Sequence, residues 1–361
     1  MSFERWMSEA LYAPALGYYA AGNVKLAGAA SRSATTVPTG PQGDFVTAPQ
    51  IGPLFARTLA SQVAEVLVAS ESTHVLEFGA GTGALAADLI DTLDRLGVCV
   101  TTYDIVEVSA DLRAVQRTHL ERFGDRVRWR EALPTAFTGC VLANELLDAM
   151  PVRAFAWDDQ GNVMERGVAV DDAGAFVWAF RPADPALAQL VGERMPPMAG
   201  YASEVNLQAE AWMASLATWL TRGAAILIDY GFPQSEFYHP QRAGGTLMAH
   251  INHHAHAEVL AAPGIQDITA HVDFTAMAQA ALDGGLDLLG YISQGRFLMN
   301  AGLGTHLETG GDIRRQTHML AAVNTLTSEA EMGELFKVMA VGRGIDVALS
   351  GFSLRDRRHM L

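Results

Sequence analysis

Three glycines at alternate positions, Gly79, Gly81 and Gly83, separate a short apolar run from a segment whose leucines recur at helical spacing. A glycine turn between a strand and a helix lets the backbone approach a ligand that a Cβ would exclude. Dinucleotide-binding turns follow G-x-G-x-x-G, whereas here the third glycine comes one residue early. Glu77, two residues before the first glycine, adds a carboxylate that suits the ammonium and sulfonium of S-adenosylmethionine (AdoMet) and not a pyrophosphate. The pattern predicts a methyl-donor loop; the alternative is a glycine turn that binds nothing.

A second acid, Glu107, ends the next β-branched run, residues 101–108. An acid at the tip of the second strand of such a fold can hold two ribose hydroxyls by a bidentate hydrogen bond. Asp104 lies three residues earlier, and the alternation of a strand places it on the opposite face. Glu107 is therefore the preferred ribose ligand. Glu131 and Ala132, just past a third short strand, are further candidates at the border of the adenine.

An amide and two carboxylates, Asn144, Glu145 and Asp148, follow a fourth apolar run. In open α/β sheets the carboxyl end of a central strand faces the ligand crevice. Glu145 and Asp148 are three residues apart, so one helical turn would place them on one side. The alternative is an Asn144 N-cap with solvated acids in the first turn, which the helix dipole favours.

The elements that must position these groups begin with a short helix, whose apolar face carries Phe3, Trp6, Met7 and Leu11. A longer helix is expected from residue 51 to about residue 70. Hydrophobic patterning then predicts strands alternating with helices, as in a parallel sheet. These first four strands are expected at residues 75–78, 101–108, 126–133 and 139–143.

Beyond residue 152 the pattern changes to alternating runs with turn signals, which predicts an antiparallel meander over residues 153–180. A helix with Ser203 as its N-cap is expected to run through Leu220. The fifth parallel strand follows at residues 223–230. Later strands are expected at residues 267–274, and at 286–291 and 340–349 as closing edge strands.

These elements predict an α/β fold: a seven-stranded, mostly parallel, Rossmann-like class I methyltransferase sheet. It has an N-terminal helical extension and an inserted antiparallel β meander plus helices after strand four. We expect four segments: a helical and lid segment (1–70), the AdoMet-binding half of the core (71–150), the insertion (151–222) and the C-terminal half of the core (223–361).

Composition limits the classes of partner. Of 361 residues, 50% are hydrophobic and 18% charged, which suffices for a packed core. The formal net charge of −15 argues against nucleic acid, whose binding neutralises phosphates, and is compatible with a cationic protein. Cys99 and Cys140 are expected as buried thiols in a reducing compartment, so a cytoplasmic location is predicted. Neither a signal peptide nor a membrane span is predicted.

Histidines gather in the C-terminal third. His250 and His254 are four residues apart and could ligate a metal ion if they were helical. No Glu-x-x-His motif or clustered cysteines accompany these two histidines, so no metal is predicted, and the alternative is loop and cap histidines. An apolar face on the meander would suit a homodimer.

Eight segments occur in the order GDFVTAPQIG, LEFGAGTGALAADL, YDIVEVSADLRAVQ, VLANELLDAMPVRAF, LIDYGF, PGIQDITAHVDF, SQGRFL and MGELFKVMAV. In sequence and order they resemble the MidA-like methyltransferases, a family that includes the mitochondrial complex I assembly factor that methylates an arginine. The resemblance runs from about Tyr18 to Val341, and NELLDAMPV and DITAHVDF are its most specific parts. This chain departs from the family at Gln50, where an acid is usual, and at Thr82, where an arginine is frequent.

The resemblance implies AdoMet as cofactor and an arginine of a protein partner as methyl acceptor. Glu145 and Asp148 would then hold the guanidinium, with Asn144 fixing their geometry. Asp44 and Thr47 would fold over the donor as a lid. A non-catalytic AdoMet-binding assembly factor is the alternative function. A nicotinamide-dependent oxidoreductase is disfavoured by the glycine spacing.

Overall fold

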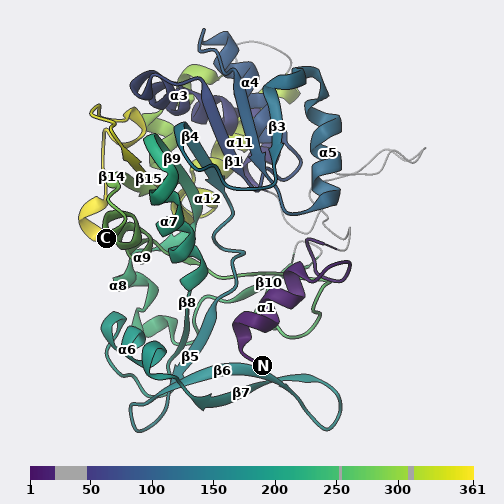
Figure 1. The fold of residues 1–361 in the computed structure, drawn as a ribbon, viewed down its shortest axis with the longest axis vertical. Helices are drawn as coiled ribbons and strands as arrows, with labels where there is room; N and C mark the ends of the chain where they lie inside the picture. Colours follow the sequence, from purple (N-terminus) through teal and green to yellow (C-terminus); the bar gives the residue numbers. More distant parts are fainter. Residues whose placement is uncertain (21–46, 252–253, 308–312) are drawn as a thin grey trace.

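The computed structural model describes residues 1–20, 47–251, 254–307 and 313–361. Its central sheet is built from β1 (His74–Phe78), β2 (Thr102–Val106), β3 (Val127–Arg130), β4 (Phe137–Asn144), β9 (Leu220–Phe232), β14 (Asp287–Ser293) and β15 (Phe336–Arg343). In space these strands follow the order β14-β15-β9-β4-β1-β2-β3 (Figure 1). Of the seven, β15 alone runs opposite to the other six. The predicted seven-stranded, mostly parallel sheet is confirmed.

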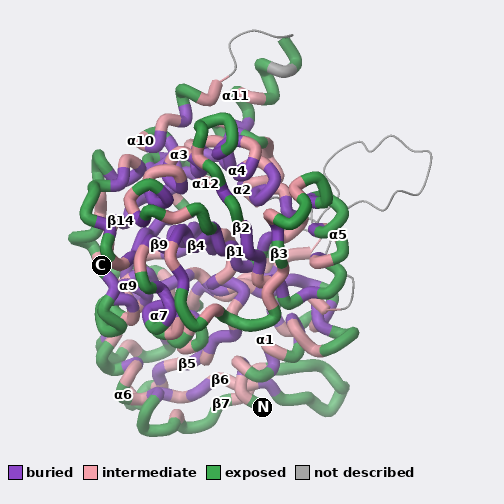
Figure 2. The backbone as a smooth tube through the Cα atoms, turned by 45° about the horizontal axis from the view of Figure 1, so that its top comes forward, coloured by how far each residue is buried: buried purple, intermediate pink, exposed green. Residues whose placement is uncertain are grey.

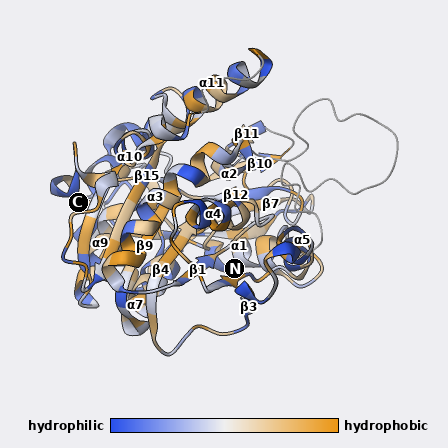
Figure 3. Cartoon of the chain, turned by 90° about the horizontal axis from the view of Figure 1, so that it is seen from above, coloured by the Kyte–Doolittle hydropathy of each residue, from blue (hydrophilic) through white to orange (hydrophobic). Residues whose placement is uncertain are grey.

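Helices cover both faces of this sheet. One face packs against α3 (Pro53–Ser70), α4 (Ala84–Arg95), α10 (Gln294–Asn300) and α11 (Ile313–Thr327). The other packs against α7 (Leu207–Trp219) and α9 (Phe274–Asp283). Because both faces are covered, the central strands β1, β4 and β9 are mostly buried (Figure 2), and most of their residues are hydrophobic (Figure 3). The short helices α2 (Ala48–Ile51), α8 (Gln234–Phe237) and α12 (Met332–Leu335) and the helix α5 (Ala110–Leu120) complete the core.

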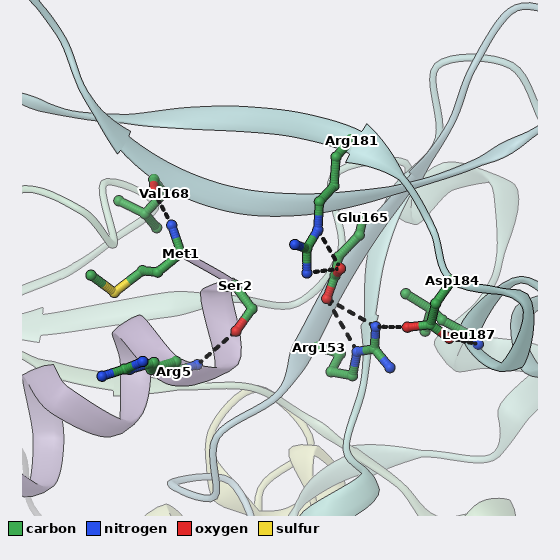
Figure 4. Close-up of polar contacts among 9 residues, drawn as sticks. All are labelled: Met1, Ser2, Arg5, Arg153, Glu165, Val168, Arg181, Asp184 and Leu187. Carbon is green, nitrogen blue, oxygen red and sulfur yellow. Dashed lines mark hydrogen bonds and ion pairs between the residues drawn. The ribbon is translucent and has the colours of Figure 1, made fainter.

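The insertion after β4 forms a second, antiparallel sheet at one end of the molecule (Figure 1). It contains β5 (Arg153–Trp157), β6 (Val163–Val170), β7 (Phe176–Pro182) and β8 (Ala202–Val205) in the order β7-β6-β5-β8, with α6 (Pro185–Arg194) beside it. The predicted meander is confirmed. Within it, the carboxylate of Glu165 binds Arg153 at 3.0 Å and Arg181 at 2.6 Å, and Arg153 reaches Asp184 at 2.6 Å (Figure 4). Phe176, Val177 and Phe180 of β7 are exposed. Such an apolar face would suit a homodimer, which stays a prediction.

The N-terminal helix α1 (Phe3–Tyr12) lies on this second sheet. The amino group of Met1 donates to Val168 O at 2.8 Å (Figure 4), and Val168 N donates to Met1 O at 2.9 Å. Phe3, Trp6 and Met7 are buried in one cluster with residues of β5 and β6, as the apolar face of the helix predicted. The insertion therefore holds the N-terminal helix α1 in place.

A third, three-stranded sheet completes the described fold. Its strands are β10 (Met248–Ile251), β11 (His254–His256) and β12 (Asp267–Thr269), in the order β11-β10-β12. The expected strand at residues 267–274 is therefore wrong as a single element. Its second half is β13 (Val272–Asp273), which pairs with β9 instead.

Three other sequence predictions are wrong in detail. Ser203 lies in β8, and the helix that follows is capped by Asn206, which accepts from Ala209 N at 2.9 Å. The last strand ends at Arg343 and lies between β9 and β14, so it is not an edge. Cys99 is exposed, while Cys140 is buried as expected.

Among the residues described, no helix has the length and apolar character needed to cross a bilayer.

Candidate active site

The glycine loop after β1 adopts a backbone that favours glycine at each of its three positions. The φ angles of Gly79, Gly81 and Gly83 are 65°, 54° and 81°, in the left-handed region that L side chains rarely adopt. A Cβ at Gly79 would also lie 3.3 Å from Leu146 Cδ1. Gly83 stands just before α4 as its N-cap. The loop is thus a cradle in which the backbone itself forms the wall.

This cradle opens on a cavity that we call the donor cavity. Its wall includes the predicted residues Thr47, Glu77, Gly79, Gly81, Glu107, Asn144 and Glu145. Tyr12 and Tyr19 from the N-terminal segment also line it. Glu131 and Ala132 are exposed beyond β3 and do not line it, so their contact with an adenine stays a prediction. Asp44 lies outside the described residues.

Glu107 follows the last residue of β2 and is 8% exposed. One carboxylate oxygen accepts from Ser109 N at 2.9 Å, and the other accepts from Gln116 Nε2 at 3.0 Å. Gln116 also donates to Gly81 O at 2.9 Å, so it ties the acid to the glycine loop. Burial raises the pKa of Glu107, and these hydrogen bonds oppose the rise. Asp104 instead binds Arg130 at 2.6 Å and does not line the cavity.

Glu77 lies under the loop at the floor of the donor cavity. It is 2% exposed, and Tyr103 donates its hydroxyl to one carboxylate oxygen at 2.7 Å. Burial raises the pKa of Glu77 to about 7, while the Tyr103 hydrogen bond opposes the rise. A cationic ligand beside this carboxylate would favour its ionised form. The two acids and the glycine cradle therefore fit AdoMet, whose ammonium and sulfonium need anions and whose ribose needs an acceptor.

A second cavity adjoins the first, and we call it the acceptor cavity. Tyr19 and Glu145 line both cavities. The remaining wall is formed by Asp148, Tyr230, His250, Asp267 and Thr269. Lysine and arginine are absent from this wall, as far as the described residues define it. The cavity is thus acidic and accessible from the donor side.

The loop after β4 brings Glu145 and Asp148 to this cavity without a helix. The predicted helical turn is wrong: residues 145–150 are irregular, and Glu145 has a φ of 52°. The amides that would start a helix instead donate to one oxygen of Asp229, from Leu146 at 3.2 Å, Leu147 at 2.9 Å and Asp148 at 3.3 Å. Asn144 Nδ2 donates to Glu145 Oε1 at 3.1 Å.

The acids of the acceptor cavity repel one another. Burial, then the charge of Asp229, raises the pKa of Glu145 to about 8. Burial and the neighbouring carboxylates raise the pKa of Asp148 well above its usual range. On the opposite wall, Asp267 accepts from the Tyr19 hydroxyl at 3.0 Å to each oxygen. An array of this kind gains most from a bound cation, which would relieve the repulsion.

Sequence reasoning missed Asp229, Asp267 and Tyr19. Asp229 ends the apolar run of the fifth parallel strand, just as Glu107 follows the second, and that position was a usable signal. Asp267 begins the DITAHVDF segment, so the resemblance marked its position without assigning it a role. No local pattern distinguishes Tyr19, which reaches the site from the N-terminal segment. The sequence predicts His250 as a loop or cap histidine, yet it lines the acceptor cavity from β10.

The two histidines considered for a metal ion are not helical. His250 lies in β10 and His254 in β11, and Ile251 is the residue paired with His254. Within the described part of the chain, no cluster of three or more His, Cys, Asp or Glu side chains is arranged to hold a metal.

The strand order, the glycine cradle and the acid at the tip of β2 together define a class I AdoMet-dependent methyltransferase. The chain belongs to the family described as "Putative S-adenosyl-L-methionine-dependent methyltransferase", whose model matches residues 54–292.

Relatives with known structures or names agree with this class. The crystal structure of a Burkholderia thailandensis protein bound to S-adenosyl-homocysteine is 47% identical and superimposes with a TM-score of 0.92, covering 100% of this chain and 92% of that one. The rat protein arginine methyltransferase NDUFAF7, mitochondrial, is 29% identical over 375 residues, which cover 93% of this chain and 79% of that protein. The human protein of the same name is also 29% identical, over 93% of this chain and 78% of its own length.

Proposed function

We propose that this chain is a protein arginine methyltransferase that binds the acceptor guanidinium in the acceptor cavity. The observation that carries the proposal is the pair of adjoining cavities that share Tyr19 and Glu145. The donor cavity suits AdoMet, and the acceptor cavity offers Glu145, Asp148 and Asp267 to a cation. The arginine methyltransferases named among the relatives add support.

The acidity of the acceptor cavity favours arginine over lysine. A lysine amine must lose its proton before it can attack a methyl group, and a ring of carboxylates would hold it as an ammonium ion. A guanidinium stays protonated and delocalises its charge over a planar fork. Carboxylates that grip this fork bidentately orient it and leave the far nitrogen free to react.

The roles of the side chains follow from their places. Glu145, at the junction of the two cavities, and Asp148 would hold the guanidinium, and Asn144 fixes Glu145 through its 3.1 Å hydrogen bond. When bound, AdoMet supplies an electrophilic methyl group, and the protein mainly aligns the nucleophile. The attacking nitrogen must release a proton, and Glu145 can accept it once cation binding has ionised its carboxylate. Thr47 would close the donor side, where it lines the cavity.

The test is the chemical identity of the methylated residue. Purified protein is incubated with methyl-labelled AdoMet and an extract of cells that lack this chain, and the labelled proteins are hydrolysed. We expect labelled methylarginine, and loss of the label with Asp148→Asn but not with Asp273→Asn, a buried carboxylate that lines neither cavity. Methyllysine, or equal labelling by both variants, would contradict the proposal.

Absence of any labelling, together with retained AdoMet binding, would favour the non-catalytic assembly factor. Deleting residues 153–180 is a poor test of that alternative, because Phe3, Trp6 and Met7 pack on this segment. Replacing the exposed Phe180 on β7 by serine probes partner binding with less damage, since the side chain is 58% exposed.

A further inference from the structure

Asp229, near the end of β9, is 1% exposed and lines neither cavity. Its Oδ2 accepts the three consecutive amides of the loop after β4, at 2.9–3.3 Å. Its Oδ1 accepts from Tyr230 N at 2.9 Å. Both carboxylate oxygens of Asp229 therefore accept hydrogen bonds. The donors to Oδ2 lie in the loop after β4, and the donor to Oδ1 lies in β9 itself. Three amides that converge on one anion form a nest of the kind that binds charged groups.

The nest explains how Glu145 can hold its unusual backbone. A glutamate at a φ of 52° lies in the left-handed region that L residues rarely adopt, and it persists only when its surroundings fix it. Glu145 N donates to Ile228 O at 2.9 Å, and the next three amides go to Asp229. The chain is thus held before and after the strained residue, by two consecutive residues of β9.

A carboxylate at position 229 is destabilised by burial and by repulsion from nearby acids, so its hydrogen bonds must account for its presence. Asp229 is buried beside Asp148 and Glu145, and burial raises its pKa to about 7 although four amides oppose the rise. An asparagine would remove the repulsion, but it has one acceptor oxygen and one NH₂ group. Its NH₂ group would therefore face either the loop amides or the amide of Tyr230, and both of these are donors. Only a carboxylate can accept from both sets of amides.

We propose that Asp229 is a positioning residue for the acceptor site, which shapes the loop after β4 so that Glu145 and Asp148 face one cation. The inference rests on the proposed function for the identity of that cation. Its structural part, that Asp229 holds the loop, stands apart from the reaction and can be measured without AdoMet.

The test compares Asp229→Asn with Asp273→Asn. Asp273 is also a buried aspartate, 8% exposed, and its Oδ1 accepts two amides at the start of α9, from Thr275 at 3.1 Å and Ala276 at 3.2 Å. Calorimetry measures the binding of agmatine, a guanidinium probe, and separately of AdoMet. We expect Asp229→Asn to weaken agmatine roughly tenfold, the size found when a group that orients ligating carboxylates is removed. AdoMet affinity should stay within about threefold in both variants, because Asp229 does not line the donor cavity. Equal agmatine affinity in the two variants would overturn the inference.

Amide resonances separate this inference from the proposed function. With ¹⁵N-leucine labelling of the wild-type protein, the amides of Leu146 and Leu147 should shift together as Asp229 titrates, and Leu147 should exchange slowly with solvent. Asp229→Asn should speed that exchange more than tenfold. If wild-type protein binds no agmatine while these amide signals behave as expected, the proposed acceptor fails and the positioning role stands. Leu147 exchange that is unchanged in Asp229→Asn would overturn the role itself.

Discussion

The hydroxyl of Tyr19 lies 3.0 Å from each carboxylate oxygen of Asp267. Tyr19 lines both cavities, and its ring stacks on that of Tyr12 with centroids 5.5 Å apart. Tyr12 in turn donates to Ala149 O at 2.9 Å, in the loop after β4. The N-terminal segment, which the second sheet anchors, therefore touches both walls of the acceptor cavity.

Tyr19→Phe should weaken the acceptor site and spare the donor site. Removing the hydroxyl deprives Asp267 of a donor and leaves its carboxylate less fixed, at a cost of roughly 0.5–1.5 kcal/mol. We expect KM for the methyl acceptor, or the Kd for agmatine, to rise about threefold to tenfold, with AdoMet affinity unchanged by calorimetry. Tyr12→Phe is the control, since it loses the bond to Ala149 and keeps the one to Asp267. Equal effects of the two variants would refute a role for the Asp267 contact.

Glu107→Ala should lower the affinity for AdoMet. The variant loses the carboxylate expected to bind the ribose and frees Gln116, which also holds Gly81 O. The expected loss is about 1–3 kcal/mol, measured by calorimetric titration. Asp104→Asn on the same strand is the control, because Asp104 binds Arg130 away from the cavity. NADH should bind neither protein. If Glu107→Ala binds AdoMet as tightly as the wild-type protein, Glu107 does not contribute to AdoMet binding.

The donor half of the site could be predicted from sequence because its parts are local. Glu77, the three glycines and Glu107 occur within about thirty residues, and each follows or ends an apolar run whose period identifies it as a strand. The central sheet could be predicted for the same reason, because each of its strands is a local apolar run. The inserted meander was also readable, since its turns carry Asp-Asp-Gln-Gly and Asp-Asp-Ala-Gly.

Of the acceptor half, the sequence pointed to Asn144, Glu145 and Asp148 but not to their backbone geometry or to the other walls, because tertiary contacts override the local pattern there. The sequence after β4 permits a helical turn, but Asp229, eighty-one residues beyond Asp148, accepts the amides that such a turn would need. Ser203 is a good N-cap by type, yet it pairs with Phe155 in the second sheet, which leaves capping to Asn206. Tyr19 and Asp267 meet only because α1 lies on the insertion and β12 lies beside it.

Glu145→Gln should stabilise the protein at high pH and leave it almost unchanged at low pH. Burial and Asp229 raise the pKa of Glu145 from 4.5 to about 8, so the folded state binds the extra proton between these values. The stability that this proton provides is present below pH 4.5 and is lost as pH rises through about 8. The variant should therefore gain about 1–3 kcal/mol at pH 9 over wild type, measured by urea unfolding without AdoMet. Glu131→Gln, at an exposed position, is the control. A gain of the same size at pH 5 would contradict the assignment.

Binding of a guanidinium to the acceptor cavity should release protons near pH 7. Glu145 and Asp148 line the acceptor cavity with Asp267, His250, Tyr19 and Tyr230, and Asp229 accepts amides of the loop that carries them. Burial raises the pKa of Asp229 to about 7 and of Glu145 to about 8. A bound cation favours the ionised carboxylates, so it lowers these pKa values and expels protons that the empty site holds. Agmatine affinity should then rise with pH from 6 to 9, and its binding enthalpy should differ between phosphate and Tris buffers by the heat of proton uptake. Asp148→Asn should reduce that difference, whereas Asp273→Asn should not. An enthalpy independent of buffer in the wild-type protein would show that binding releases no protons and would contradict this prediction.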